Sequence, residues 1–166
     1  MFLGSDASEL KLRIEAPQAS VLHFAARALL DDTAPMSSFI GLASGSGKQD
    51  EGFLQAREIM NLNTNAGLVV VSTAQQKGGI NGSANLGFSW SWFVAGSTAT
   101  MLGRWEVDSP AALQLMNGFY NRIKPTTRLQ PSRAAAMRQS ILSLRQTTEY
   151  QHPYFWANFA LVGDAQ

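Results

Sequence analysis

GLVVVS, residues 67–72, is the stretch that decides the fold class of this 166-residue chain. Its apolar run does not alternate with polar residues, so it predicts a strand that is buried on both faces, as in the centre of a parallel sheet. A shorter strand is predicted before it at residues 20–24 (SVLHF) and another after it at residues 98–102 (TATML). Segments with helical spacing separate these strands, which favours βαβ units and a mostly parallel sheet with helices on both faces.

Predicted helices and strands alternate along the rest of the chain. The first helix is expected to begin at Asp6, with Glu9 reaching back to cap it, and to end at Pro17. A nearly all-apolar helix over residues 83–95 is expected to stop at Gly96. Further strands are predicted at residues 38–43 and 159–162, and further helices at residues 56–62, 110–123 and 131–145. No repeat or linker divides the chain, so we expect a single domain over residues 1–166.

Composition excludes several classes of protein. Hydrophobic residues make up 45% of the chain and charged residues 15%, which is typical of a globular domain and not of a disordered tail. The net charge is +1 and no two basic residues are adjacent, so a nucleic-acid-binding surface is not expected. With no cysteine, the chain has neither disulfides nor a thiolate metal site nor a cysteine nucleophile.

The sequence also lacks the features of membrane-spanning, secreted and metal-binding proteins. No apolar run is long enough to cross a membrane, and the N-terminal residues do not resemble a signal peptide, so we expect a cytoplasmic protein. The two histidines, His23 and His152, lie far apart in the sequence, and neither a metal nor a cofactor is expected. All four tryptophans have apolar neighbours and are predicted to lie in the core.

Two predicted strand ends carry the residues of greatest functional interest, because chemistry in parallel sheets lies beyond the carboxyl ends of the strands. They are VLHFAARA at residues 21–28 and LVVVSTAQQ at residues 68–76. These segments resemble the HFATHG and SACETG strand ends of the CHAT domain family, the caspase-like peptidase module of bacterial TPR-associated proteins. Arg27 and Ala74 stand at the histidine and cysteine positions, 47 residues apart, close to the separation of about 50 in caspases.

Further motifs extend this resemblance over nearly the whole chain. They lie at residues 4–10, 29–35 and 52–60, at WEVD (residues 105–108), and at HPYFWANF (residues 152–159) with the following GD at 163–164. The resemblance implies a caspase-like three-layer α/β sandwich with a mostly parallel central sheet. Family members carry one more strand before the point where this sequence begins. We therefore expect a sheet that lacks this first strand and has an open edge. Either the sequence is truncated relative to the family, or another segment or a second copy completes the sheet.

The replaced residues imply that the peptidase activity of the family is lost. In active relatives the histidine removes the thiol proton and the cysteine attacks the peptide carbonyl. Arg27 stays protonated at physiological pH and Ala74 has no nucleophilic atom. Ala28 stands where relatives have glycine, and Gln75 and Gln76 stand where they have Glu and Thr. Natural divergence after loss of catalysis accounts for all of these changes together.

Two alternatives remain open at the level of sequence. One is a residual hydrolase that uses Ser72 or Thr73, and the other is a degenerate fragment without a function. Thr73 is expected to point away from the face that Ala74 occupies, while Ser72 shares that face but lies deeper in the sheet. His23 lies within a strand, so we interpret it as a packed, hydrogen-bonded residue and not as a substitute base.

The leading prediction is a catalytically inactive peptidase homologue that binds a protein or peptide at the vestigial cleft. Around the dyad positions, the residues assigned to this cleft are His23, Ala28, Ser72, Thr73, Gln75 and Asp108. Arg27 adds a positive charge, which favours an acidic partner. Asp108 would receive a basic group, or it would serve only as an acid at a helix N-terminus. We expect Arg27 and Ala74 to face one another at the ends of adjacent parallel strands.

Overall fold

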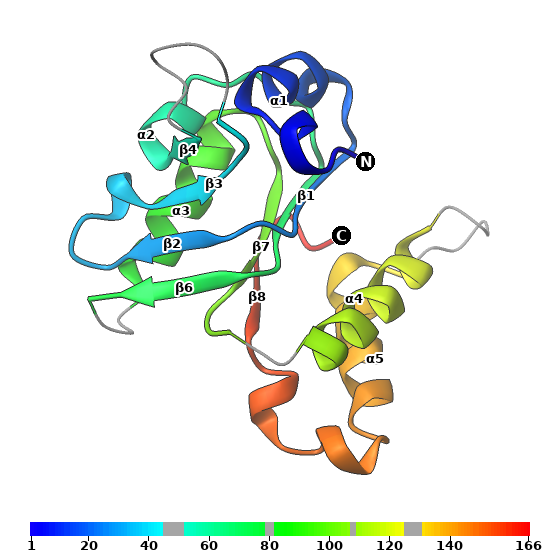
Figure 1. Cartoon of the computed structure of the whole chain (residues 1–166). Helices are drawn as coiled ribbons and strands as arrows, with labels where there is room; N and C mark the ends of the chain where they lie inside the picture. The colour runs from blue at the N-terminus through cyan, green and yellow to red at the C-terminus, as the bar shows by residue number, and fades with distance from the viewer. Residues whose placement is uncertain (45–51, 79–81, 107–108, 125–130) are drawn as a thin grey trace.

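Two four-stranded sheets form the framework of the protein in a computed structural model, which describes residues 1–44, 52–78, 82–106, 109–124 and 131–166 (Figure 1). The first sheet has the strand order β1-β5-β7-β8, in which only the last pairing is antiparallel. Its strands are β1 (Val21–Phe24), β5 (Leu68–Val71), β7 (Ala99–Gly103) and β8 (Phe159–Gly163). The second sheet has the order β4-β3-β2-β6. Its strands are β2 (Ala28–Asp31), β3 (Phe39–Gly41), β4 (Phe53–Gln55) and β6 (Ala74–Lys77).

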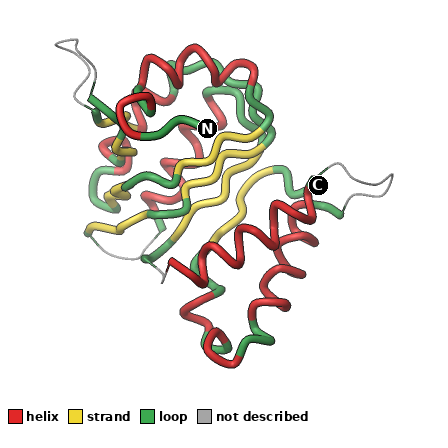
Figure 2. The backbone as a smooth tube through the Cα atoms, turned by 45° about the vertical axis from the view of Figure 1, so that its right-hand side comes forward, coloured by secondary structure: helices red, strands yellow, loops and turns green. Residues whose placement is uncertain are grey.

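Helices cover both faces of the first sheet (Figures 1 and 2). One face packs against α4 (Ser109–Ile123) and α5 (Arg133–Leu144), and the other packs against α3 (Ser83–Val94). The remaining helices are α1 (Glu9–Glu15), α2 (Ala56–Ile59) and the 3-10 turns Gly4–Asp6, Ala16–Gln18, Pro35–Ser37, Thr148–Tyr150 and Pro153–Phe155. The predicted caspase-like three-layer α/β sandwich, with a mostly parallel central sheet, is therefore confirmed.

The central strand β5 divides the hydrophobic core into two clusters. Val69 and Val71 belong to the cluster that contains Trp92 of α3, whereas Leu68 and Val70 belong to the cluster under α4 and α5. All four strand residues are buried. Since each such side chain contributes roughly 1.5–3 kcal/mol when fully buried, the apolar run fixes β5 between two layers.

The second sheet was not predicted. β2 and β6 continue the directions of β1 and β5 after short breaks, and they pair in parallel with each other. β3 and β4 then add to β2 as an antiparallel hairpin-like pair. The sequences AQQK and FLQ of β6 and β4 are short and partly polar, so their periodicity gives no strand signal.

The start of the first helix also differs from the prediction. Ser8, and not Asp6, is the N-cap of α1, because its Oγ accepts a hydrogen bond from the Lys11 amide at 3.3 Å. Asp6 instead ends a separate 3-10 turn. Serine and aspartate are similarly good caps, so their order along the chain did not distinguish them.

The first sheet has open edges at β1 and β8. Association of a second copy through an open edge stays a prediction. Within the described ranges, none of the helices combines the length and the apolar character that crossing a membrane would require.

Candidate functional site

The two segments that resemble the peptidase strand ends lie side by side, where the first sheet passes into the second (Figure 1). Phe24 of β1 pairs with Val71 of β5, and Ala28 of β2 pairs with Ala74 of β6. Between these pairs, the Ser72 amide donates to the Phe24 carbonyl and the Ala28 amide donates to the Thr73 carbonyl, each at 3.1 Å. We call residues 25–27 and 72–73 the strand junction.

The side chains at the two dyad positions lie on opposite faces of the junction. Ala74 is 1% exposed and packs with Ala28 in the core cluster that contains α3. Arg27 is exposed, and its guanidinium donates a hydrogen bond to Oε1 of Gln75 at 3.3 Å. Successive side chains of a strand alternate between its faces, so Gln75, the neighbour of Ala74, is the residue that meets Arg27. The expectation that Arg27 faces Ala74 does not hold.

Arg27 belongs to a line of three exposed polar side chains. The Gln75 amide accepts from Arg27 and donates through Nε2 to Oε2 of Glu106 at 3.3 Å. Glu106 is held in turn by Tyr154, whose hydroxyl donates to the Glu106 carbonyl at 2.7 Å. Trp105 supports this contact by donating from Nε1 to the Tyr154 carbonyl at 3.0 Å. We call Arg27, Gln75 and Glu106 the polar line; it joins a cation to an anion through one amide.

Glu106 is the functional candidate that sequence reasoning missed. The WEVD motif at residues 105–108 directed attention to Asp108, which lies outside the described residues. Glu106 stands two residues earlier, in the segment that follows β7. Both acids belong to one motif, and the motif alone does not indicate that Glu106 reaches the junction.

The hydroxyls of Ser72 and Thr73 donate to the main chain. Ser72 Oγ donates to the Phe24 carbonyl at 3.4 Å, and Thr73 Oγ1 donates to the Ala26 carbonyl at 2.6 Å. A hydroxyl nucleophile needs a base that accepts its proton. In the described part of the chain, neither hydroxyl is hydrogen-bonded to a histidine, a carboxylate or a lysine.

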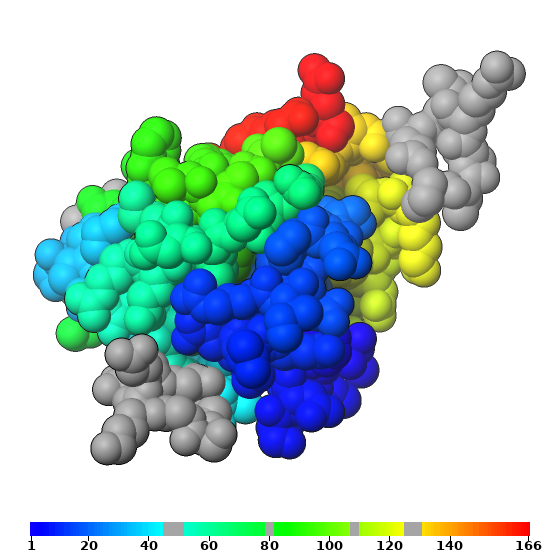
Figure 3. Space-filling view, turned by 90° about the horizontal axis from the view of Figure 1, so that it is seen from above, coloured from blue at the N-terminus to red at the C-terminus, as the bar shows by residue number. Residues whose placement is uncertain are grey.

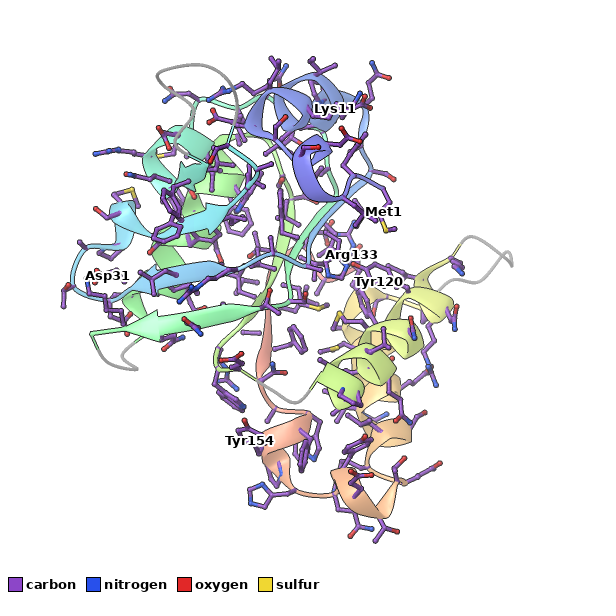
Figure 4. The ribbon with its side chains drawn as sticks, viewed as in Figure 1. Met1, Lys11, Asp31, Tyr120, Arg133 and Tyr154 are labelled. Atoms are coloured by element: carbon purple, nitrogen blue, oxygen red, sulfur yellow. The ribbon has the colours of Figure 1, made fainter. Side chains whose placement is uncertain are left out.

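The His23 side chain contacts Tyr120 of α4, away from the strand junction. Its Nδ1 lies 2.9 Å from the hydroxyl of Tyr120, and the two rings stack with centroids 5.5 Å apart (Figure 4). Loss of solvent around the pair lowers the pKa of His23 and raises the pKa of Tyr120 to about 12. Both shifts favour the uncharged forms of the two side chains, which share one hydrogen bond between Nδ1 and the phenol oxygen. The histidine is hydrogen-bonded, but it remains exposed and is not part of the core.

His152, the other histidine, has a local structural role. Its Nδ1 accepts a hydrogen bond from the Tyr154 amide at 3.2 Å, which caps the turn Pro153–Phe155. That turn positions Tyr154 against Glu106. The HPYFWANF motif therefore supports the polar line through Tyr154. His152 itself caps the turn that carries this tyrosine.

Comparison with known proteins agrees with this architecture. The family model described as the CHAT domain matches residues 1–164 of the 166-residue chain. A search of the curated proteins gave no match. Since the match covers nearly the entire chain, this protein belongs to the CHAT domain family of caspase-like proteins.

Proposed function

We propose that this CHAT domain is a non-catalytic homologue of a caspase-like peptidase that binds a protein or peptide segment at the strand junction. The observation that carries the proposal is that Arg27 is exposed and hydrogen-bonded within the polar line, whereas Ala74 is buried. A guanidinium cannot act as a general base and a methyl group cannot attack a carbonyl. What the junction presents to solvent is instead an arginine, an amide and a carboxylate, which are groups suited to recognition.

The charges of the polar line favour a ligand with an acid on the side of Arg27. Glu106 opposes this preference, because its carboxylate is connected to Arg27 through Gln75. An exposed ion pair contributes only about 0–1 kcal/mol, so the expected affinity for a short acidic peptide is modest. Removing Arg27 and removing the charge of Glu106 are expected to act in opposite directions.

A residual hydrolase is the less favoured function. It would require Ser72 or Thr73 to give up its proton, and both hydroxyls donate to main-chain carbonyls. The nearest histidine in the sequence, His23, is already bonded to Tyr120. A fluorophosphonate probe that labels the protein, with labelling lost in Ser72→Ala, would favour this alternative.

The binding proposal is tested by fluorescence anisotropy with a fluorescein-labelled peptide of alternating Glu and Ala. Arg27→Ala is expected to raise the Kd about two- to fivefold, the range for one charged contact at an exposed site. Glu106→Gln is expected to lower it. Arg57→Ala, on the exposed side of α2, removes the same charge elsewhere and serves as the control. An affinity that does not change in Arg27→Ala contradicts the proposal.

A further inference from the structure

A shallow apolar groove lies between α5 and β8, apart from the strand junction. Its volume is about 370 Å³, and its walls include Met137, Arg138, Ile141 and Leu142 of α5 and Leu161 of β8. Figure 3 shows the C-terminal segment in red lying against α5 in orange. Residues beyond β8 hold the segment near the start of α5, because the Arg133 guanidinium donates to the Asp164 carbonyl at 2.9 Å (Figure 4).

The groove adjoins a free sheet edge. Among the strands that the structure describes, β8 pairs with β7 alone and is the last of its sheet. The Arg104 amide donates to the Asn158 carbonyl and the Asp164 amide donates to the Thr98 carbonyl. In an antiparallel pair, the residues that bond the partner alternate with residues that do not. Leu161 therefore presents its N–H and C=O to the outer edge, and within the described residues no backbone hydrogen bond reaches it from that side.

The wall of the groove carries an unpaired cation. Arg138 is exposed and, in the parts of the chain that the structure describes, forms no ion pair or hydrogen bond. α5 contains no acidic residue. Leu142, one turn further along the same wall, is 41% exposed although it is apolar. The groove thus offers apolar contacts and one positive charge on the same side of the sheet.

We propose that an extended peptide segment adds to β8 as a further strand, with apolar side chains in the groove and an acidic side chain at Arg138. Strand addition uses main-chain hydrogen bonds for affinity and pockets for alternate side chains for specificity. Both requirements are met here. The main-chain N–H and C=O of Leu161 lie at the free edge, and its side chain lines the groove. Side chains of the added strand that align with Leu161 would enter the groove, because paired residues share a face.

A second copy of this chain is a poorer occupant than an acidic peptide. Two β8 strands paired about a two-fold axis perpendicular to the sheet place both α5 helices on the same face. Each α5 brings Arg138 and no acid, so the two copies oppose one another electrostatically. A partner with an acidic residue removes this repulsion.

The test uses the full chain and a fluorescein-labelled peptide TVTLTDTT, whose Val, Leu and Asp share one face of a strand. Arg138→Glu is expected to weaken binding about tenfold, and to improve binding of the matched peptide TVTLTKTT. Leu142→Glu, a change at an exposed position, is expected to weaken binding of TVTLTDTT, because it removes an apolar contact and adds a negative charge to the groove. Arg57→Glu, at an exposed position outside the groove and the strand junction, makes the same change of charge and is expected to leave the affinity unchanged.

Methylated peptides test the strand addition itself. Only one of the two alternate sets of peptide amides can bond β8, so methylation of one set is expected to abolish binding and methylation of the other to preserve it. No saturable binding of TVTLTDTT, or equal affinity in the wild type, Arg138→Glu and Leu142→Glu, would overturn the proposal. Self-association of the protein that Leu142→Glu abolishes would also overturn it, because the groove would then bind a second copy.

Discussion

Asp31 ties the end of β2 to the end of β6. Its carboxylate accepts hydrogen bonds from the Thr33 amide at 2.9 Å, the Thr33 hydroxyl at 2.6 Å, the Ala34 amide at 3.2 Å and the Lys77 ammonium at 3.0 Å (Figure 4). These donors favour the charged form, with the Thr33 hydroxyl contributing most, and they hold the pKa of Asp31 well below its usual range. The carboxylate therefore stabilises the turn after β2 only while it is ionised.

Acid is expected to remove this stabilisation. Because the pKa of Asp31 is lowered by folding, its contribution is complete above the ordinary aspartate value of about 3.9 and declines as the pH falls further. Asp31→Asn is expected to lower the urea midpoint at pH 7, and the difference from the wild type is expected to shrink below about pH 4. Urea unfolding followed by circular dichroism at several pH values measures this. A matched change at an exposed acid, Asp6→Asn, is expected to have little effect, and a difference that is independent of pH would contradict the account.

Protonation of His23 is expected to lower the stability of the protein in a higher pH range than protonation of Asp31. Folding lowers its pKa, so the unfolded chain takes up the proton first and the folded state loses stability as the pH falls below about 6.5. The wild type is expected to lose more stability between pH 7 and pH 5 than His23→Asn, which cannot be protonated. Urea midpoints over this range test the prediction. Parallel pH profiles for the two proteins would show that His23 titrates alike in both states.

At the level of elements, α3 is unusual because apolar residues occupy its exposed face as well as its buried one. Trp92 is 0% exposed and lies in the core cluster, whereas Trp90 is 61% exposed. The prediction that all four tryptophans lie in the core is therefore wrong for Trp90. Leu86 and Val94 share its exposed face, one turn away on either side. A helix that is apolar all round has no periodic pattern to identify its inner face.

The two tryptophans are expected to respond very differently to truncation. Trp92→Ala leaves a large cavity between α3 and the first sheet and is expected to cost roughly 3–5 kcal/mol of unfolding free energy. Trp90→Ala removes a surface side chain and is expected to change stability by no more than about 0.5 kcal/mol. Urea unfolding followed by far-ultraviolet circular dichroism provides both values. Similar losses in the two variants would place Trp90 in a buried contact.

The elements that could be located well from the sequence are those whose buried residues form a continuous apolar run or a helical period. β1, β5 and β7 are apolar and continuous, and α4 has a clear helical period, so all were located within a few residues. β2, β4 and β6 are three or four residues long, and their pairing depends on neighbours that are distant in the chain. Propensity in such short strands is weaker than the tertiary contacts that form them.

Part of the candidate site could be predicted, because some of its residues follow strands that have a clear sequence pattern. Arg27 and Gln75 follow strands that could be located, so their proximity follows from the parallel pairing of those strands. Glu106 follows β7, and Tyr154 holds its backbone at the same junction. That contact joins residues 48 apart in sequence, and no local pattern encodes it.

On the scale of the whole molecule, one parallel strand pair connects two sheets. The pair β1–β5 belongs to the first sheet and its continuation β2–β6 to the second, so the strand junction lies where the two sheets meet (Figure 2). The main-chain hydrogen bonds across the junction need no particular side chain at position 27 or 74. The pairing of these strands therefore does not depend on which side chains occupy positions 27 and 74.

The central claim is that this chain binds peptides at the strand junction and does not cleave them. The most direct test is mass spectrometry of a proteome-derived peptide library after incubation with the protein, with bound and unbound fractions analysed separately. The account predicts a bound fraction enriched in acidic peptides with intact ends, and a weaker enrichment in Arg27→Ala. New peptide termini that appear with the wild type and disappear in Ser72→Ala or Thr73→Ala would contradict it and show that hydrolysis survives without the cysteine.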